Sequence, residues 1–535
     1  MKLFKIRRLL NIKQKIGQLF VVGFPGKELT VELKQMIHEY HIGGVILFAH
    51  NIGSPDEVLN LTTSLQKEAK QAGYKYPMLI AIDEENGTVK RLGEGAGEYP
   101  GAMALSATKQ SKYAYEVGKA TGDDLYQLGI NWNFAPVLDV NNNPSNPVIG
   151  VRSFGETPEM VSEFGIEFMR GLQNAGVATA VKHFPGHGDT NTDSHYALPK
   201  INHDIERLHK VELVPFKKAI EKGADSIMTA HIVFPALEPE EGRPATLSKR
   251  IITDLLRKEL EYDGVIVTDA LEMDAIADTI GIADGAVEAL KAGADQLLIG
   301  HLPEEQLKTL QRVGKAVNHG EVSLQRIQES LTRLKKLKEK YVKWSDLNLN
   351  ETKISPRFNN KEKQALALEA YKKSVTILKS GEVLDRDSKV LVLQPKDELR
   401  TIAEDTTEEN YILAQTIKKY INHVEIEIVT NHLSEEERSL LLEKSEQFDR
   451  VILGTMMVQK EDNILELART INQSRPLDIL SMKSPYVGQW LPTANFWINT
   501  YEPSQTPIRL AIQALVGESD PTGNSPVTLT NISEE

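Results

Sequence analysis

Residues 177–195 read VATAVKHFPGHGDTNTDSH. The opening segment, residues 177–181, is short and apolar, which is typical of a strand buried inside a sheet. The next fourteen residues, 182–195, contain one lysine, three histidines and two aspartates. Loops carry function when a rigid scaffold presents their side chains, and Gly186 and Gly188 give this loop backbone freedom. We therefore interpret residues 182–195 as a catalytic loop that follows a buried strand.

Runs similar to this strand recur along the first part of the chain, and amphipathic stretches with a helical period separate them. They are residues 18–24, 44–49, 78–83, 131–140, 177–183, 226–231, 265–269 and 296–299. The runs are almost entirely apolar rather than alternating, as expected for parallel strands that are covered on both faces. Eight strand–helix units in one domain favour a TIM-type (β/α)8 barrel, with an open doubly wound sheet as the alternative.

Polar side chains stand at or just beyond the ends of six of these runs. They are Asn51, Asp83, Asp139, the pair Lys182 and His183, His231, and Asp269. In a TIM barrel the active site is built at the carboxyl ends of the strands. We therefore expect these side chains to meet on one face, which a purely structural protein would not require.

A second, smaller domain is predicted after the barrel. Further strand candidates at residues 389–393, 424–429, 451–453 and 477–480 alternate with helical stretches, which favours an αβα sandwich. A polar, weakly patterned segment precedes them. We predict a barrel domain over residues 1–343, a linker over residues 344–365 and the sandwich over residues 366–535, and we leave the role of the sandwich open.

Composition excludes several classes of protein. The chain has 535 residues, no cysteine and a formal net charge of -13 at pH 7. A non-specific nucleic-acid binder needs a basic surface, and disulfide or thiolate chemistry needs cysteine. The basic N-terminal stretch is not followed by the apolar segment of a signal peptide, and no run reaches the roughly 20 apolar residues of a membrane span. These features predict a cytoplasmic protein with no nucleic-acid or membrane partner.

Two candidates for catalytic chemistry come from the local sequence. Asp269 ends an apolar run, which suits a nucleophilic carboxylate, although Glu272 three positions on would also suit a helix cap at Asp269. Asp193 lies two residues before His195, and a carboxylate there can fix the imidazole tautomer for proton transfer. The alternative for His195 is an exposed loop histidine.

Arg91, Arg152 and Lys182 are candidates for a polar pocket that binds a ligand rich in hydroxyl or carboxyl groups, although each could be a structural charge. The acidic run at residues 83–85 has a solvated loop as its plain interpretation.

A zinc site is a further alternative for the loop, because zinc takes mixtures of histidine and carboxylate ligands. Its ligands would be His183, His187, Asp189 and His195. Their spacing matches no helical arrangement of ligands, since Pro185 and two glycines prevent a regular helix. We therefore predict no metal.

At this loop the chain resembles the bacterial β-N-acetylglucosaminidases of glycoside hydrolase family 3, whose signature reads K-H-F-P-G-H-G-x-x-x-x-D-S-H. Supporting segments are residues 43–48, 129–131, 135–139, 152–155, 228–231, 244–248 and 267–269. The resemblance covers about residues 14–340 and continues more weakly to residues 523–529.

The resemblance implies a barrel followed by an αβα sandwich, and a retaining double displacement without a metal or organic cofactor. It implies that Asp269 is the nucleophile and that His195 is the general acid/base, with Asp193 orienting it. The residues that match positions binding the N-acetylglucosamine ring are Asp83, Arg91, Arg152, Lys182 and His183.

One stretch differs from the family pattern. The family often reads D-Q-E-G-G-R-V-x-R where residues 83–91 of this chain read DEENGTVKR. The outer Asp83 and Arg91 are kept, and residues 84, 86 and 88 differ.

The resemblance implies an exo-acting β-N-acetylglucosaminidase whose partner is a small carbohydrate, with fragments containing GlcNAc–MurNAc from peptidoglycan recycling as the expected substrate. A phosphorylase using the same residues is the first alternative, because a neutral imidazole repels phosphate less than a carboxylate does. A catalytically silent sugar-binding protein and a metal-dependent hydrolase are the others. The oligomeric state is not predicted.

Overall fold

The computed structural model describes residues 12–93, 95–190, 198–396 and 411–529. Within these residues, eight parallel strands close into a barrel, and β1 pairs with both β2 and β8. The strands are β1 (Phe20–Val22), β2 (Gly44–Leu47), β3 (Leu79–Ile82), β4 (Trp132–Asn133), β5 (Ala178–Phe184), β6 (Ser226–Thr229), β7 (Val265–Ala270) and β8 (Gln296–Ile299). The predicted TIM-type barrel is therefore confirmed, and the open doubly wound sheet is excluded.

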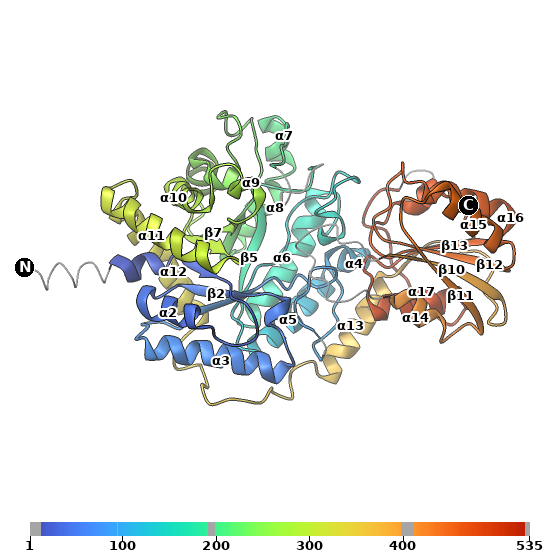
Figure 1. The fold of residues 1–535 in the computed structure, drawn as a ribbon, viewed down its shortest axis with the longest axis horizontal. Coiled ribbons are helices and arrows are strands. Elements are labelled where there is room, and N and C mark those ends of the chain that lie inside the picture. Colours follow the sequence, from blue (N-terminus) through green and yellow to red (C-terminus); the bar gives the residue numbers. More distant parts are fainter. Residues whose placement is uncertain (1–11, 94, 191–197, 397–410, 530–535) are drawn as a thin grey trace, which may run out of the picture.

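Helices surround the barrel (Figure 1). They are α2 (Val31–Tyr40), α3 (Pro55–Gln71), α4 (Ala102–Ala107), α5 (Lys112–Gln127), α6 (Pro158–Asn174), α7 (Ile205–Lys210), α8 (Val214–Glu221), the π-helix η4 (Arg250–Glu259), α9 (Asp274–Ala277), α10 (Ile282–Ala292), α11 (Pro303–His319) and α12 (Leu324–Tyr341). Several begin at a side-chain cap that the sequence supplies. Ser54 accepts from the backbone N–H of Glu57 at the start of α3, and Thr157 accepts from Met160 at the start of α6.

The fourth strand is much shorter than the predicted run of residues 131–140. Only Trp132 and Asn133 pair regularly with their neighbours. Pro136 has no N–H to donate to a ladder. The chain beyond it runs beside β5 through separate backbone bonds, in which Lys182 donates to Pro136 and Leu138 donates to Lys182.

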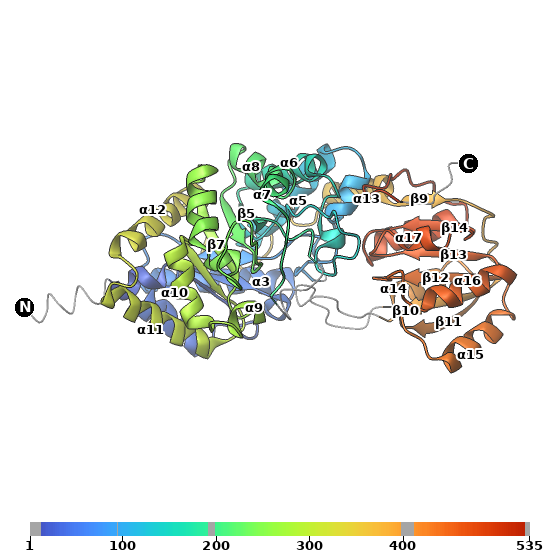
Figure 2. The same ribbon diagram turned by 90° about the horizontal axis from the view of Figure 1, so that it is seen from above.

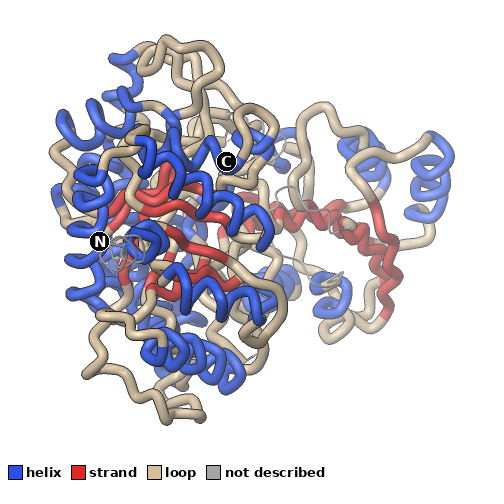
Figure 3. The backbone as a smooth tube through the Cα atoms, turned by 60° about the vertical axis from the view of Figure 1, so that its left-hand side comes forward, coloured by secondary structure: helices blue, strands red, loops and turns tan. Residues whose placement is uncertain are grey.

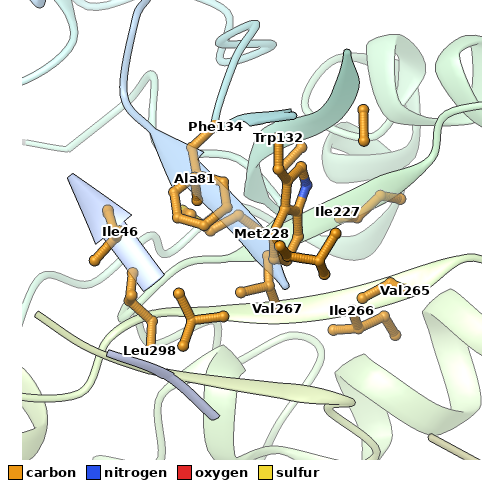
Figure 4. Packing of buried hydrophobic residues seen from close by; sticks show 14 of the residues in the cluster. Ile46, Ala81, Trp132, Phe134, Ile227, Met228, Val265, Ile266, Val267 and Leu298 are labelled. Carbon is orange, nitrogen blue, oxygen red and sulfur yellow. The ribbon is translucent and has the colours of Figure 1, made fainter. Parts of the chain in front are cut away.

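The barrel interior is filled by apolar side chains from many of its strands, so it is a packed core (Figure 4). Trp132 is fully buried there, and its indole N–H donates to Ser226 Oγ over 2.9 Å. Ile46, Val267 and Leu298 lie around it in the same close-up. The core closes the middle of the barrel and leaves the strand ends to form a site.

The second domain is built on a six-stranded sheet within the described residues, in the order β11-β10-β12-β13-β14-β9. Its strands are β9 (Thr376–Lys379), β10 (Lys389–Pro395), β11 (His423–Val429), β12 (Arg450–Thr455), β13 (Leu477–Ser481) and β14 (Phe496–Asn499). Its helices are α14 (Ile412–Ile417), α15 (Glu435–Ser445), α16 (Ile464–Ser474) and α17 (Gln505–Leu515). Figures 2 and 3 show helices on both faces of this sheet, which confirms the αβα sandwich.

The two domains are joined by the segment between α12, which ends at Tyr341, and α13 (Lys361–Ser374), which leads into β9. The predicted linker at residues 344–365 overlaps this segment. The exact domain boundaries remain a prediction.

The carboxyl edge of the second sheet packs against the barrel. Residues that follow its strands form a buried apolar cluster with α4 and the short helix η2 (Gly150–Arg152). The cluster contains Met103, Ala104, Ala107, Val151, Tyr486, Tyr501 and Val527. Glu502 accepts from the backbone N–H of Gly101 over 2.8 Å at the same junction. The sandwich therefore packs against α4 and against η2, and η2 ends at Arg152.

None of the described helices combines the length and the apolar character that a membrane crossing needs.

Candidate active site

A cavity of about 200 Å³ lies at the carboxyl end of the barrel strands. Six residues predicted as site residues line it: Asp83, Arg91, Arg152, Lys182, His183 and Asp269. They come from segments that are distant in the sequence. Asp83 and Arg91 follow β3, Arg152 ends η2, and the other three lie near the ends of β5 and β7. Of the residues expected at the strand ends, Asp83, Lys182, His183 and Asp269 line this cavity.

The strand ladder is interrupted at two places that carry polar site residues. The register of β5 against β6 shifts between Val181 and Phe184, and that of β7 against β8 shifts between Val267 and Ala270. Bulges are common beside active sites because an extra residue re-aims a side chain. The first shift contains Lys182 and His183, and the second contains Asp269.

Lys182 is the centre of a buried charge network. Its Nζ lies 2.6 Å from Asp83 Oδ1 and 2.7 Å from Glu85 Oε1, and its side chain is only 3% exposed. Burial alone would lower the pKa of Lys182, but the charges of Asp83 and Glu85 raise it above its ordinary value. The lysine is therefore held as a cation inside the cavity wall.

Glu85 bonds to two cations at once. Arg152 donates to both of its carboxylate oxygens, from Nε over 2.9 Å and from Nη2 over 2.8 Å, and Lys182 shares one of them. Burial would raise the pKa of Glu85, yet Arg152 and Lys182 together hold it well below its ordinary range. A two-bond arginine–carboxylate pair fixes orientation as well as charge.

The interpretation of residues 83–85 as a possible solvated loop is wrong for Glu85, which is buried. Asp83 and Glu85 both line the cavity, whereas the intervening Glu84 points elsewhere and accepts from the backbone N–H groups of Arg91 and Leu92. Alternation along an extended segment, with a period of two residues, is the signal that could have singled out Glu85.

His183 and His187 are arranged around one buried carboxylate, Asp139. Asp139 Oδ2 lies 2.7 Å from His183 Nδ1, and Oδ1 accepts from the backbone N–H of His187 over 2.7 Å. Burial would raise the pKa of Asp139, but His183 lowers it below its ordinary value. Burial and the neighbouring His183 lower the pKa of His187 to about 4, so His187 is neutral near pH 7. Asp139 thus holds both His183 and His187 in place through hydrogen bonds.

Asp269 lies in the last part of β7 and is partly exposed to the cavity. Its Oδ1 accepts from the backbone N–H of Ala270 over 2.8 Å. The next helix, α9, begins at Asp274 with Met273 as its N-cap, so Asp269 does not cap it. A carboxylate in this position can reach a ligand in the cavity.

Asn51 and His231 also lie near the strand ends, but they bond to the backbone instead of lining the cavity. Asn51 is buried and donates to the carbonyls of Phe24 and Gly26. His231 Nε2 donates to the carbonyl of Ala270 over 3.0 Å, which places it behind Asp269. Their role in the described structure is to hold the loops around the site.

Asp193 and His195 lie outside the described residues, so their predicted roles have no geometry here. The zinc alternative included His195 and is affected in the same way. Across the described ranges, no group of three or more histidine, aspartate or glutamate side chains is placed to hold a metal ion.

The family pattern described as "Glycosyl hydrolase family 3 N terminal domain" matches residues 11–337. The chain belongs to glycoside hydrolase family 3. A solved family 3 β-N-acetylglucosaminidase from Paenibacillus sp. FPU-7 is 40% identical and superimposes with a TM-score of 0.89, covering 97% of this chain and 98% of that one. The resemblance to β-N-acetylglucosaminidases of this family is thus confirmed over both domains.

Curated relatives match over somewhat more than half of the chain. Beta-hexosaminidase A of Pseudoalteromonas piscicida is 42% identical over 332 residues, which are 58% of this chain and 56% of that protein. The match therefore spans little more than half the length of that relative. A beta-hexosaminidase of Idiomarina loihiensis is 33% identical over 327 residues, which are 58% of this chain and 96% of that protein.

Proposed function

We propose that this glycoside hydrolase is a retaining exo-β-N-acetylglucosaminidase that releases N-acetylglucosamine from β-linked glycosides. One observation carries the proposal: the partly exposed carboxylate of Asp269 shares a small cavity with the charge network of Lys182. A cavity of about 200 Å³ suits a terminal sugar better than a long chain. The similarity to proteins named beta-hexosaminidase and β-N-acetylglucosaminidase supports the choice of sugar.

In the proposed reaction, Asp269 attacks the anomeric carbon and forms a covalent glycosyl-aspartate, which water then hydrolyses. Two inversions at one carbon give net retention. His195 protonates the departing oxygen in the first step and deprotonates the water in the second, and Asp193 orients its imidazole. The roles of Asp193 and His195 rest on the family resemblance.

The sugar hydroxyls would be bound by the charged wall opposite Asp269. Asp83 is a suitable acceptor, because its side chain is 17% exposed while one of its oxygens is fixed by Lys182. Lys182, Arg91, Arg152 and His183 are suitable donors that line the same cavity. Charge-assisted hydrogen bonds of this kind are roughly twice as strong as neutral ones, which favours a polyhydroxyl ligand over an apolar one.

The experiment is an assay of an aryl β-N-acetylglucosaminide with purified protein, with and without phosphate. We expect free N-acetylglucosamine as the main product under both conditions. N-acetylglucosamine 1-phosphate as the main product would instead establish the phosphorylase alternative. Failure of the protein to turn over any aryl β-N-acetylglucosaminide would contradict the proposal, and full activity in the presence of a chelator would exclude the metal-dependent alternative.

The natural substrate that we propose is a GlcNAc–MurNAc fragment of peptidoglycan, in keeping with a cytoplasmic recycling enzyme. The measurement is kcat/KM on GlcNAc–MurNAc relative to chitobiose. A clear preference for chitobiose would remove the peptidoglycan assignment and leave the glycosidase activity in place.

A further inference from the structure

Glu272 is a cavity-lining carboxyl group that the proposed reaction does not use. It lies three residues beyond Asp269, in the short connection between β7 and α9, and its side chain contributes to the same cavity. Its two oxygens are in different environments, and the difference points to a function for each.

Oε1 holds the loop that follows β8. It accepts from the backbone N–H of Gly300 over 2.5 Å and from that of His301 over 2.9 Å. The imidazole of His301 in turn packs on Phe48, with 4.1 Å between the ring centroids, and both rings line the cavity. Glu272 Oε1 therefore fixes one side of the cavity mouth.

Oε2 is buried and has no hydrogen-bond partner among the residues that the structure describes. A buried polar oxygen without a partner is costly, and proteins rarely leave one unless a ligand or a water completes it. Burial first, and then the charge of Asp269, raise the pKa of Glu272 to about 7, despite the two backbone N–H groups that favour the ionised form. Glu272 and Asp269 both line the cavity, so a ligand bound there can contact both carboxyl groups.

We propose that Oε2 of Glu272 accepts a hydrogen bond from the amide N–H of the 2-acetamido group of the bound sugar. This inference rests on the proposed function and names the residue that recognises the group next to the reacting carbon. Asp269 must approach the anomeric carbon, and the 2-substituent is attached to the adjacent carbon. An N–H donor on this 2-substituent would give Oε2 a hydrogen-bond partner. It would also reduce the repulsion between the carboxylates of Glu272 and Asp269. The charged wall around Lys182 would bind the more distant hydroxyls.

The test compares two aryl β-glycosides that differ by a single donor. One carries the 2-acetamido group, and the other carries a 2-O-acetyl group, in which an ester oxygen replaces the N–H. The readout is the ratio of kcat/KM for the amide to kcat/KM for the ester. The assay is run at about pH 8, above the pKa of about 7, so that Glu272 is mostly ionised and Oε2 can accept. Because a hydrogen bond to a charged acceptor contributes strongly, we expect a ratio of about tenfold or more in the native protein and a ratio near one in Glu272→Gln. Glutamine retains an oxygen for Gly300 and His301 but places an amide nitrogen, which cannot accept, at Oε2.

Glu84→Gln is the matched control. The Glu84 carboxyl group also accepts two consecutive backbone N–H groups, from Arg91 over 2.8 Å and Leu92 over 3.0 Å, and burial also raises its pKa to about 7. It does not belong to the residues that line the described cavity. We expect Glu84→Gln to retain the native ratio, whatever its effect on stability.

The outcomes separate the inference from the proposed function. A native ratio in Glu272→Gln, or an equal loss on both substrates, would overturn the inference and leave Glu272 with a structural role alone. Absence of turnover of both glycosides by the native protein would contradict the proposed function itself. If Glu272→Gln does not fold, Glu272→Asp is measured in its place. The shorter side chain withdraws Oε2 from the sugar, so the ratio must again fall for the inference to stand.

Discussion

The carboxyl edges of the two sheets are used in opposite ways. In the barrel, this edge surrounds a cavity lined by Asp83, Lys182 and Asp269. In the sandwich, the corresponding edge is covered by the barrel through an apolar cluster that includes Tyr486 and Tyr501. Ligand sites in α/β proteins commonly form at this edge of a parallel sheet. The same geometry therefore serves binding where it stays open and domain docking where it is covered.

A buried glutamate at each edge shows the physical difference. Glu85 lies between two cations, Arg152 and Lys182, which hold its pKa well below the ordinary range against the effect of burial. Glu502 accepts from neutral donors, namely Gly101 N–H, Tyr371 OH and Ser504 OH, and burial raises its pKa above the ordinary value. The environment favours the charged form of Glu85 at the barrel edge, where a polar ligand is expected. At the domain junction the environment disfavours the charged form of Glu502.

The largest expected effect is that of Asp269→Asn. Removal of the proposed nucleophile should lower kcat by about 10⁴-fold or more, because no neighbouring group can form the covalent bond in its place. The measurement is turnover of an aryl β-N-acetylglucosaminide together with the free energy of unfolding. Asp254→Asn, which alters an exposed pair with Lys258 on η4, is the control. Turnover by Asp269→Asn within tenfold of the native rate would contradict this assignment.

Glu85→Ala should impair both stability and activity. The substitution leaves Arg152 and Lys182 as neighbouring buried cations with one carboxylate fewer, and breaking such a buried network costs about 3–5 kcal/mol. We expect denaturant unfolding to show a loss of this order, and KM to rise. If both quantities stayed at their native values, the barrel edge would not depend on this charge network.

Glu502→Ala should lower stability while leaving the chemical step largely intact. It removes the acceptor for Gly101 N–H and Tyr371 OH at the domain junction, and each buried donor left unpaired costs about 1–3 kcal/mol. Denaturant unfolding measures the loss, and kcat on the folded fraction measures the activity. A fall in kcat as large as that of Asp269→Asn would show that the sandwich edge takes part in catalysis.

The two glutamates should give opposite pH dependences. The pKa of Glu502 is raised on folding, so its contribution to stability is full at low pH and is lost as the pH rises through its folded value. The pKa of Glu85 is lowered, so its contribution is full above its unfolded value and is lost as the pH falls.

The free energy of unfolding of the native protein is therefore compared with that of Glu502→Gln and of Glu85→Gln between pH 3 and pH 8. The difference for Glu502→Gln should grow as the pH falls, and that for Glu85→Gln should shrink at the acid end, each by at most about 1.4 kcal/mol per pH unit. Slopes of the same sign would contradict the comparison.

The sequence predicted the barrel well because its strands are apolar runs that lie at regular intervals. Residues 177–183, for example, correspond to β5, which extends to Phe184. The strand predicted at residues 131–140 is too long, since apolar composition does not reveal that regular pairing with β5 ends at Asn133. Hydrophobic pattern finds a buried segment, whereas backbone hydrogen bonding decides how much of it is a strand.

The candidate site was predicted in part. Asp83, Lys182 and Asp269 were found because titratable residues directly follow apolar runs. Glu85 and Glu272 were missed as members of the cavity wall, since their importance comes from partners distant in the sequence, Arg152 for one and the loop after β8 for the other. Local patterns show which residues could react, and only tertiary contacts show which of them meet.

The proposed mechanism requires Asp269 to form a covalent bond to the sugar. Incubation with a fluorinated N-acetylglucosamine analogue that slows hydrolysis of the intermediate, followed by peptide mapping by mass spectrometry, tests this directly. We predict one glycosylated peptide, with the adduct on Asp269. An adduct on another residue, or rapid turnover of the analogue with no adduct on any peptide, would contradict the account.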